Sequence, residues 1–88
     1  MRRDMEWKAR RADGRRYRVR VRCFGKQYRF QLKEEGAENW DTRRTPEIAD
    51  LETLRETVRR RFQRRQASLE DLARAEELLR RARESAGG

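Results

Sequence analysis

The chain of 88 residues has no histidine, a single cysteine and a single proline. Without histidine it can form neither a Ser–His nor a Cys–His nucleophile pair, and it has no imidazole metal ligand. Cys23 alone can form neither an internal disulfide nor a cysteine-based zinc site. We therefore expect no catalytic residue, no metal and no cofactor, and interpret Cys23 as a small core residue.

Long hydrophobic runs are also missing. No apolar segment approaches the roughly 20 residues that a transmembrane helix needs, and Met1-Arg2-Arg3-Asp4 leads into no apolar run of the kind found in a signal peptide. Hydrophobic residues make up 34% of the chain and charged residues 47%. That balance favours a partner or a second copy that covers apolar surface. We expect no membrane association and a cytoplasmic location, at the nucleoid if the protein binds DNA.

Acidic residues are scarce in the first part of the chain. Residues 1–33 carry 13 positive and 3 negative groups, whereas residues 34–88 carry 12 and 13, so the whole net charge of +9 comes from the first part. The cations are 22 Arg and 3 Lys, and Arg is suited to bidentate phosphate contacts. A GC-rich genome or a thermophilic source would also explain the excess of Arg. The uneven charge suggests a surface for a polyanion.

The stretch 15–33 alternates between apolar and basic residues on both sides of Gly25-Lys26. Successive side chains of a strand point to opposite faces. The pattern therefore predicts a β-hairpin with a two-residue, glycine-first turn. Its register pairs apolar residues on one face: Cys23 with Tyr28, Val21 with Phe30 and Val19 with Leu32.

Residues 5–11 alternate in the same way and precede Ala12-Asp13-Gly14, which fits a three-residue hairpin loop with Gly14 in the left-handed conformation. This loop places Trp7 opposite Val19. A two-residue loop would place Trp7 opposite Arg20 instead, because a slip of one residue turns every side chain over. The apolar partners favour the longer loop, and the three strands form an antiparallel meander.

The second face of this meander is basic. Only Glu6 offsets the cations there, and like charges directly opposite each other destabilise a sheet by a few tenths of a kcal/mol per pair. Folding stability gives no reason to gather them. Three interpretations remain: a nucleic-acid-binding face, a face for an acidic protein, or a solvated face whose Arg stems cover apolar surface and deter edge pairing. Gln31 also lies on this face, and the candidate nucleic-acid-binding residues are Lys8, Arg10, Arg16, Arg18, Arg20, Arg22, Arg29 and Lys33.

A connector over residues 34–45 contains one large anchor, Trp40. Trp40 either packs under the sheet or on the first helix, or is exposed and stacks on a base or a partner. The following segment predicts a helix with Thr45 as N-cap and Pro46 as its first residue. A second basic strip, either a phosphate-binding surface or a solvated helix end that compensates the helix dipole, comprises Arg59, Arg60 and Arg64.

Ser68 looks like the cap of a second helix. Residues 46–84 form either a helical hairpin that turns near residues 66–68, or one long helix that exposes Leu72 and Leu79 and needs a second chain. The alternation of apolar stripe and cap favours the hairpin. The predicted fold is α+β: a three-stranded antiparallel meander plus connector over 1–45, then two helices over 46–88 packed on its apolar face, in a single small domain.

These features favour a non-enzymatic protein that binds nucleic acid, DNA rather than RNA. A ribonucleoprotein-type sheet needs exposed aromatic residues, whereas Tyr17, Tyr28 and Phe30 point to the core and only Phe24 falls on the charged face. The alternative is a small accessory protein, of the phage or mobile-element type, that binds an acidic surface of a larger protein complex. Such a protein could form a homodimer through its helices.

Residues 7–33 also resemble the small three-stranded DNA-binding domains of tyrosine-type phage integrases. The matching segments are Trp7-Lys8-Ala9, Arg18-Val19-Arg20-Val21 and Gly25-Lys26, which cover about a third of the chain. The resemblance implies DNA binding through the sheet. It departs from the family pattern after the third strand, where the family helix follows almost at once. Here a twelve-residue connector intervenes and a second helix is added.

Overall fold

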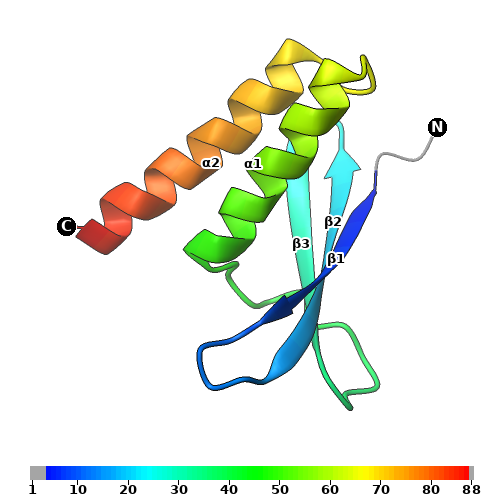
Figure 1. Cartoon of the computed structure of the whole chain (residues 1–88), viewed down its shortest axis with the longest axis vertical. Helices are drawn as coiled ribbons and strands as arrows, with labels where there is room; N and C mark the ends of the chain where they lie inside the picture. Colours follow the sequence, from blue (N-terminus) through cyan, green and yellow to red (C-terminus); the bar gives the residue numbers. More distant parts are fainter. Residues whose placement is uncertain (1–3, 88) are drawn as a thin grey trace. The chain divides into compact units, whose positions relative to one another are not determined.

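The computed structural model describes residues 4–87 and has the predicted α+β order of elements. The chain divides into two compact units, the sheet unit Met1–Pro46 and the helical unit Glu47–Gly88. Packing of the helices on the apolar face of the sheet stays a prediction. The elements, labelled in Figure 1, are β1 (Met5–Arg10), β2 (Arg16–Phe24), β3 (Gln27–Glu34), α1 (Ile48–Gln63) and α2 (Leu69–Gly87).

The three strands form one antiparallel sheet in the order β1-β2-β3 (Figure 1). Both predicted registers are confirmed. Val19 of β2 lies opposite Trp7 on one side and opposite Leu32 on the other. Arg20 lies opposite Glu6 and Gln31 on the other face of the sheet.

Two glycine turns set these registers. The β1–β2 loop is closed by the Arg11 N–H, which donates to the Arg15 carbonyl at 2.8 Å, and the Gly14 N–H donates to the Arg11 carbonyl at 3.0 Å. Gly14 has φ of 91° and Gly25 has φ of 57°. A side chain at either position would be held in a conformation that costs an L-residue about 1–2 kcal/mol. Gly14 therefore has the positive φ that the sequence predicted, and Gly25 is the first residue of the predicted two-residue turn.

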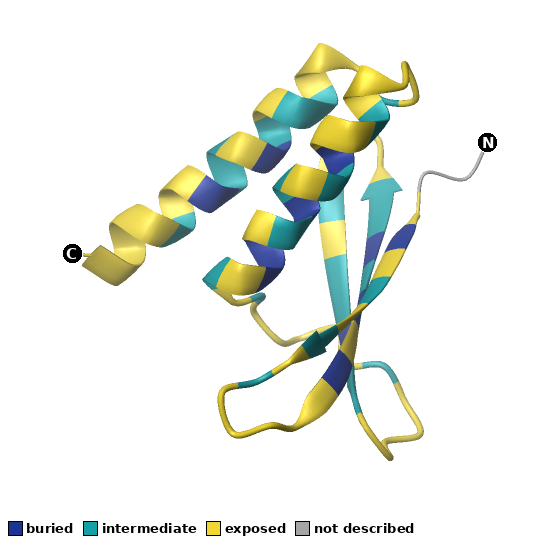
Figure 2. Cartoon of the chain, in the orientation of Figure 1, coloured by how far each residue is buried: buried dark blue, intermediate teal, exposed yellow. Residues whose placement is uncertain are grey.

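Alternation along the sheet separates buried from exposed residues, as the bands along β2 in Figure 2 show. Burying a Val or Leu side chain contributes about 1.5–3 kcal/mol. A one-residue slip would turn several such side chains outward at once, which explains why one register is selected. Cys23, at the end of this face, is half-buried. The buried residues of the sheet unit are Met5, Tyr17, Val19, Val21 and Leu32.

The helical unit is a hairpin, which confirms one of the two predicted alternatives and rules out the continuous helix. The argument for a homodimer that rested on a continuous helix no longer applies. The chain reverses after α1 through a Schellman motif, in which the Arg65 N–H donates to the Phe62 carbonyl at 3.0 Å and the Gln66 N–H donates to the Arg61 carbonyl at 2.7 Å. Arg65 occupies the left-handed position with φ of 61°, where glycine is more usual.

Ser68 caps α2, as predicted. The Asp71 N–H donates to Ser68 Oγ at 3.1 Å, and the Ser68 N–H donates to Asp71 Oδ2 at 2.9 Å. The two residues thus satisfy each other's backbone N–H groups, which is the reciprocal arrangement of a capping box. This cap allows α2 to begin immediately after the turn.

The predicted start of the first helix is wrong. The N-cap is Glu47, with an extended backbone, and the first helical residue is Ile48. With Thr45 as N-cap, the third helical position would be Ile48, whose side chain has no polar atom to accept a hydrogen bond from the backbone N–H of the N-cap. With Glu47 as N-cap that position is Asp50, whose Oδ2 accepts the Glu47 N–H at 3.0 Å.

The apolar stripes of the two helices account for the buried apolar residues of the helical unit; buried residues, which also include Asp50, are dark blue in Figure 2. Neither stripe stays buried as far as the turn, because Phe62 is 38% exposed and Leu69 is 66% exposed. An ion pair between Arg83 Nη2 and Glu52 Oε2 at 3.6 Å joins α2 to α1. The buried apolar residues of the stripes are Leu51, Leu54, Val58, Ala75 and Leu79.

Candidate nucleic-acid interface

The polar side of the sheet carries the predicted cations, and we call it the cationic face. Alternation with the buried residues of β2 and β3 directs these side chains to the same side. The register arranges them in cross-strand rows, of which the longest is Lys8–Arg18–Lys33, running across all three strands. The exposed members are Lys8, Arg10, Arg16, Arg18 and Arg29, and the half-buried members are Arg20, Arg22 and Lys33.

Two acids partly offset this face. Glu6 lies 3.7 Å from Arg18 and 3.6 Å from Arg20, and Asp4 lies 3.9 Å from Arg22. The sequence had identified only Glu6, because Asp4 precedes the predicted strand. Pairs of this length between partly exposed groups contribute about 0–1 kcal/mol. Glu6 and Asp4 pair with three of the eight cations, so this side of the small sheet keeps an excess of positive charge even when Glu35, at its end, is counted.

Several of these cations have no acidic neighbour. Within residues 4–87, the side chains of Lys8, Arg10 and Arg16 make no hydrogen bond, ion pair or ring contact. Arg29 stacks on Phe24, with its guanidinium carbon 5.1 Å from the ring centroid. The protein's own acids therefore leave a large part of the cationic face open to an external anion.

Trp40 of the connector contacts two cations of the sheet. The guanidinium carbon of Arg20 is 4.1 Å from the centre of its ring, and Lys33 Nζ is 5.9 Å away. Trp40 is therefore half-buried over the cationic face, and the predicted packing under the sheet is wrong. The cause is a single β-bridge between Leu32 and Asp41, closed by two backbone hydrogen bonds of 3.0 and 2.7 Å.

This bridge attaches the connector to the outer edge of β3. Paired residues direct their side chains to the same face, and their neighbours point the opposite way. Leu32 is buried on the apolar face, so Trp40, next to Asp41, is directed to the cationic face. A one-residue bridge has no sequence period, and the sequence carried no signal for it.

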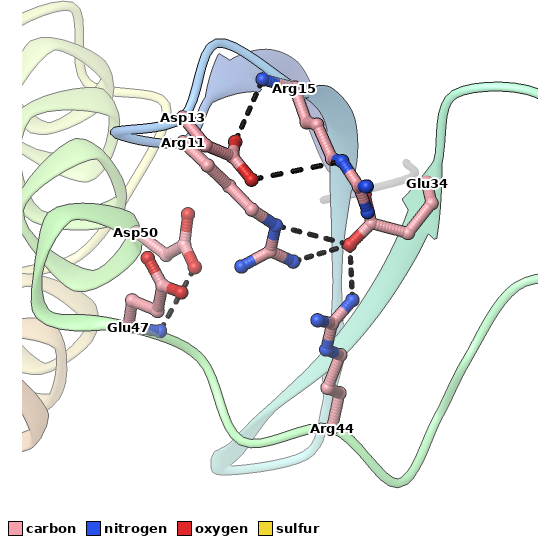
Figure 3. Close-up of polar contacts among 7 residues, drawn as sticks. All are labelled: Arg11, Asp13, Arg15, Glu34, Arg44, Glu47 and Asp50. Atoms are coloured by element: carbon pink, nitrogen blue, oxygen red, sulfur yellow. Dashed lines mark hydrogen bonds and ion pairs between the residues drawn. The ribbon is translucent and has the colours of Figure 1, made fainter.

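Basic residues outside the cationic face support the structure instead. Figure 3 shows Glu34 Oε1 accepting hydrogen bonds from Arg11 Nε at 3.1 Å, from Arg11 Nη2 at 2.5 Å and from Arg44 Nη1. These bonds, first from Arg11 and then from Arg44, hold the pKa of Glu34 below its usual value. Arg11 also covers the ring of Tyr17, with its guanidinium carbon 4.5 Å from the centroid. Sequence reasoning assigned no role to this cluster, although the strand period places Arg11 on the side of Tyr17.

The second basic strip is exposed, and its use for phosphate binding stays a prediction. Arg59 Nη1 lies 4.0 Å from Glu56, and the backbone N–H of Arg64 caps the end of α1 by donating to the Arg60 and Arg61 carbonyls. By contrast, the cations of α2 are paired: Arg80 and Arg81 both contact Glu77.

Comparisons of the chain with protein-family models, with curated proteins and with solved structures found no match. The resemblance to integrase domains therefore gains no support from them. Neither α1 nor α2 has an apolar stretch long enough to span a membrane. In the described part of the chain, no three of the acidic residues and Cys23 lie close enough together to hold a metal ion.

Proposed function

We propose that this protein binds nucleic acid, DNA in preference to RNA, through the cationic face and without catalysis. The single observation that supports this proposal is the excess of positive charge on one side of the sheet unit. The rows Lys8–Arg18–Lys33 and Arg22–Arg29 set like charges directly opposite each other, which destabilises the free protein. A row of phosphates would convert this repulsion into attraction and release counterions from the nucleic acid.

The positions of the aromatic residues favour contacts with phosphates and duplex shape. Recognition of splayed RNA bases uses aromatic rings exposed on the sheet. Here Tyr17, Tyr28 and Phe30 lie on the apolar side. The two rings on the cationic side, Phe24 and Trp40, are each already stacked with an Arg. These contacts leave charge as the main means of attraction.

The test is a fluorescence-anisotropy titration of labelled duplex DNA, duplex RNA and single strands at several salt concentrations. Neutralising Z phosphates of duplex DNA gives a log–log slope of about −0.9Z. If the face contacts about four phosphates, the affinity falls about 100-fold between 50 and 200 mM salt. We expect the duplex DNA to bind most tightly at every salt concentration.

Two triple variants locate the binding surface. The first variant replaces Arg16, Arg18 and Arg29 by Gln and so removes three charges from the cationic face. It should bind more weakly, and its salt slope should be flatter by about 0.9 for each phosphate that is no longer neutralised. The control removes the same net charge from helical arginines that are paired with acids, and should leave the slope unchanged. Equal effects of the two variants, or no salt-sensitive binding by the unaltered protein, would overturn the proposal and favour an acidic protein partner instead. The control variant carries Arg80, Arg81 and Arg83→Gln.

A further inference from the structure

One part of the cationic face is hollowed. A depression of about 300 Å³ lies at the end of the sheet where β2 begins and β3 ends. The turn after β3 forms one wall, held there by the Glu35 N–H, which donates to the Arg16 carbonyl at 3.1 Å. The residues of this hollow that matter below are Lys8, Arg16, Arg18, Lys33, Glu35 and Gly36.

The row Lys8–Arg18–Lys33 crosses this hollow. Residues directly opposite each other in a sheet have Cβ atoms about 4.5–5.5 Å apart, so three cationic side chains from three strands start close together. Arg16, two residues before Arg18 on the same face of β2, adds a fourth.

The charges in the hollow are poorly compensated. Of its four cations, only Arg18 forms an ion pair within residues 4–87, with Glu6 at 3.7 Å. Lys8 and Arg16 have no side-chain partner within residues 4–87. Glu35, at the wall of the hollow, is exposed. The acid that precedes it, Glu34, is already bound by Arg11 and Arg44. An anion placed here would meet several donors from different strands at once.

We propose that this hollow binds one phosphate group and thereby fixes the position of the nucleic acid on the cationic face. The inference deepens the proposed function and rests on it for the source of the phosphate. Lys ammonium and Arg guanidinium groups both form charge-assisted hydrogen bonds to phosphate oxygens. A backbone phosphodiester and a terminal phosphomonoester offer the same oxygens, and the test below separates them. The remaining cations would follow the neighbouring phosphates without fixing a register.

The first experiment titrates inorganic phosphate into the isotope-labelled protein, followed by amide NMR, with sodium chloride of equal ionic strength as the reference. We expect saturable shifts confined to amides around the hollow. Shifts spread evenly over the cationic face, or equal to those in chloride, would overturn the proposal. This titration needs no nucleic acid, so it gives a result even if the proposed function is wrong.

The second experiment compares two double variants in binding to duplex DNA. The hollow variant replaces Lys8 and Lys33 by Gln and so removes two cations of the hollow. The control variant replaces Arg10 and Arg29 by Gln, which removes two cations of the same strands and the same face that lie outside the hollow. Removing the phosphate-binding groups of the hollow should weaken binding about tenfold more than the control does. Equal effects would overturn the proposal while leaving nucleic-acid binding intact. Should the hollow variant fail to fold, the phosphate titration of the unaltered protein decides alone.

To identify the source of the phosphate, we compare the affinities of oligonucleotides with and without a 5′- or 3′-terminal phosphate. A gain in affinity from the terminal phosphate that disappears in the Lys8 and Lys33→Gln variant identifies a strand end as the ligand. Equal affinity of the two oligonucleotides, with the variant still impaired, identifies a backbone phosphodiester. Either result supports the site, and an unimpaired variant refutes it.

Discussion

Replacing Glu34 by Gln should destabilise the sheet unit by about 1 kcal/mol. The Glu34 carboxylate joins segments that are far apart in sequence, because it accepts two hydrogen bonds from Arg11 and one from Arg44 (Figure 3). The side chains of Arg11, Glu34 and Arg44 are 17%, 35% and 42% exposed. Charged hydrogen bonds contribute about 1.5–3 kcal/mol, and exposed ion pairs only about 0.2–1 kcal/mol. A partly exposed cluster therefore falls between these values, and Gln retains part of the bonding.

Urea unfolding followed by tryptophan fluorescence measures this destabilisation, since Trp7 and Trp40 both belong to the sheet unit. The matched control is Glu35→Gln. Glu35 is the neighbouring acid and is exposed, and it makes no ion pair within residues 4–87. Its replacement should change the free energy of unfolding by less than about 0.5 kcal/mol. Equal destabilisation in the two variants would refute the role assigned to the cluster.

The same pair of proteins gives a pH test. Hydrogen bonds from Arg11 and Arg44 lower the pKa of Glu34 in the folded state from 4.5. The stabilisation is therefore present above the unfolded-state pKa and is lost as the pH falls through the lower, folded-state pKa. The difference between the unaltered protein and Glu34→Gln should stay constant from neutral pH to about pH 5 and shrink below it. A difference that persists unchanged at lower pH would contradict this reasoning.

Three further changes test single contacts. Ser68→Ala should cost about 1 kcal/mol of stability in thermal unfolding followed by circular dichroism, and an unchanged melting curve would contradict the cap. Arg65→Gly should raise stability by about 0.5–1 kcal/mol because it relieves φ of 61°, whereas Arg64→Gly, at φ of −93°, should lower it. A double-mutant cycle of Trp40→Leu and Arg20→Gln should give a coupling energy of about 0.5–1 kcal/mol in urea unfolding. A coupling of zero would show that their stacking contributes nothing.

The sheet was predictable residue by residue because two independent constraints agreed. The glycine turns at Gly14 and Gly25 set the loop lengths, and the apolar alternation around Val19 and Val21 set which side chains face each other. Either constraint by itself leaves a second register open, as the two loops considered for Asp13-Gly14 illustrate. Together they leave one, because a slip of one residue exposes the core.

The connector and the first helix boundary were not predictable in the same way. Trp40 is positioned by the bridge between Leu32 and Asp41, a contact with no periodic signal. The choice between Thr45 and Glu47 as N-cap depends on which acid can reach back to a free backbone N–H. Each outcome depends on one or two hydrogen bonds, and such a small energy difference is invisible to a pattern read over many residues.

The order of residues was sufficient to determine the two-sided character of the sheet, its pairing and the excess of positive charge, because strand periodicity and turn geometry act over a few residues. The order did not reveal which cations remain uncompensated. Arg11 and Arg44 both bind Glu34, whereas Lys8 and Arg16 line an open hollow. Ion pairs form over a few ångströms between segments distant in sequence, so only the folded chain separates the structural arginines from those that can bind a partner.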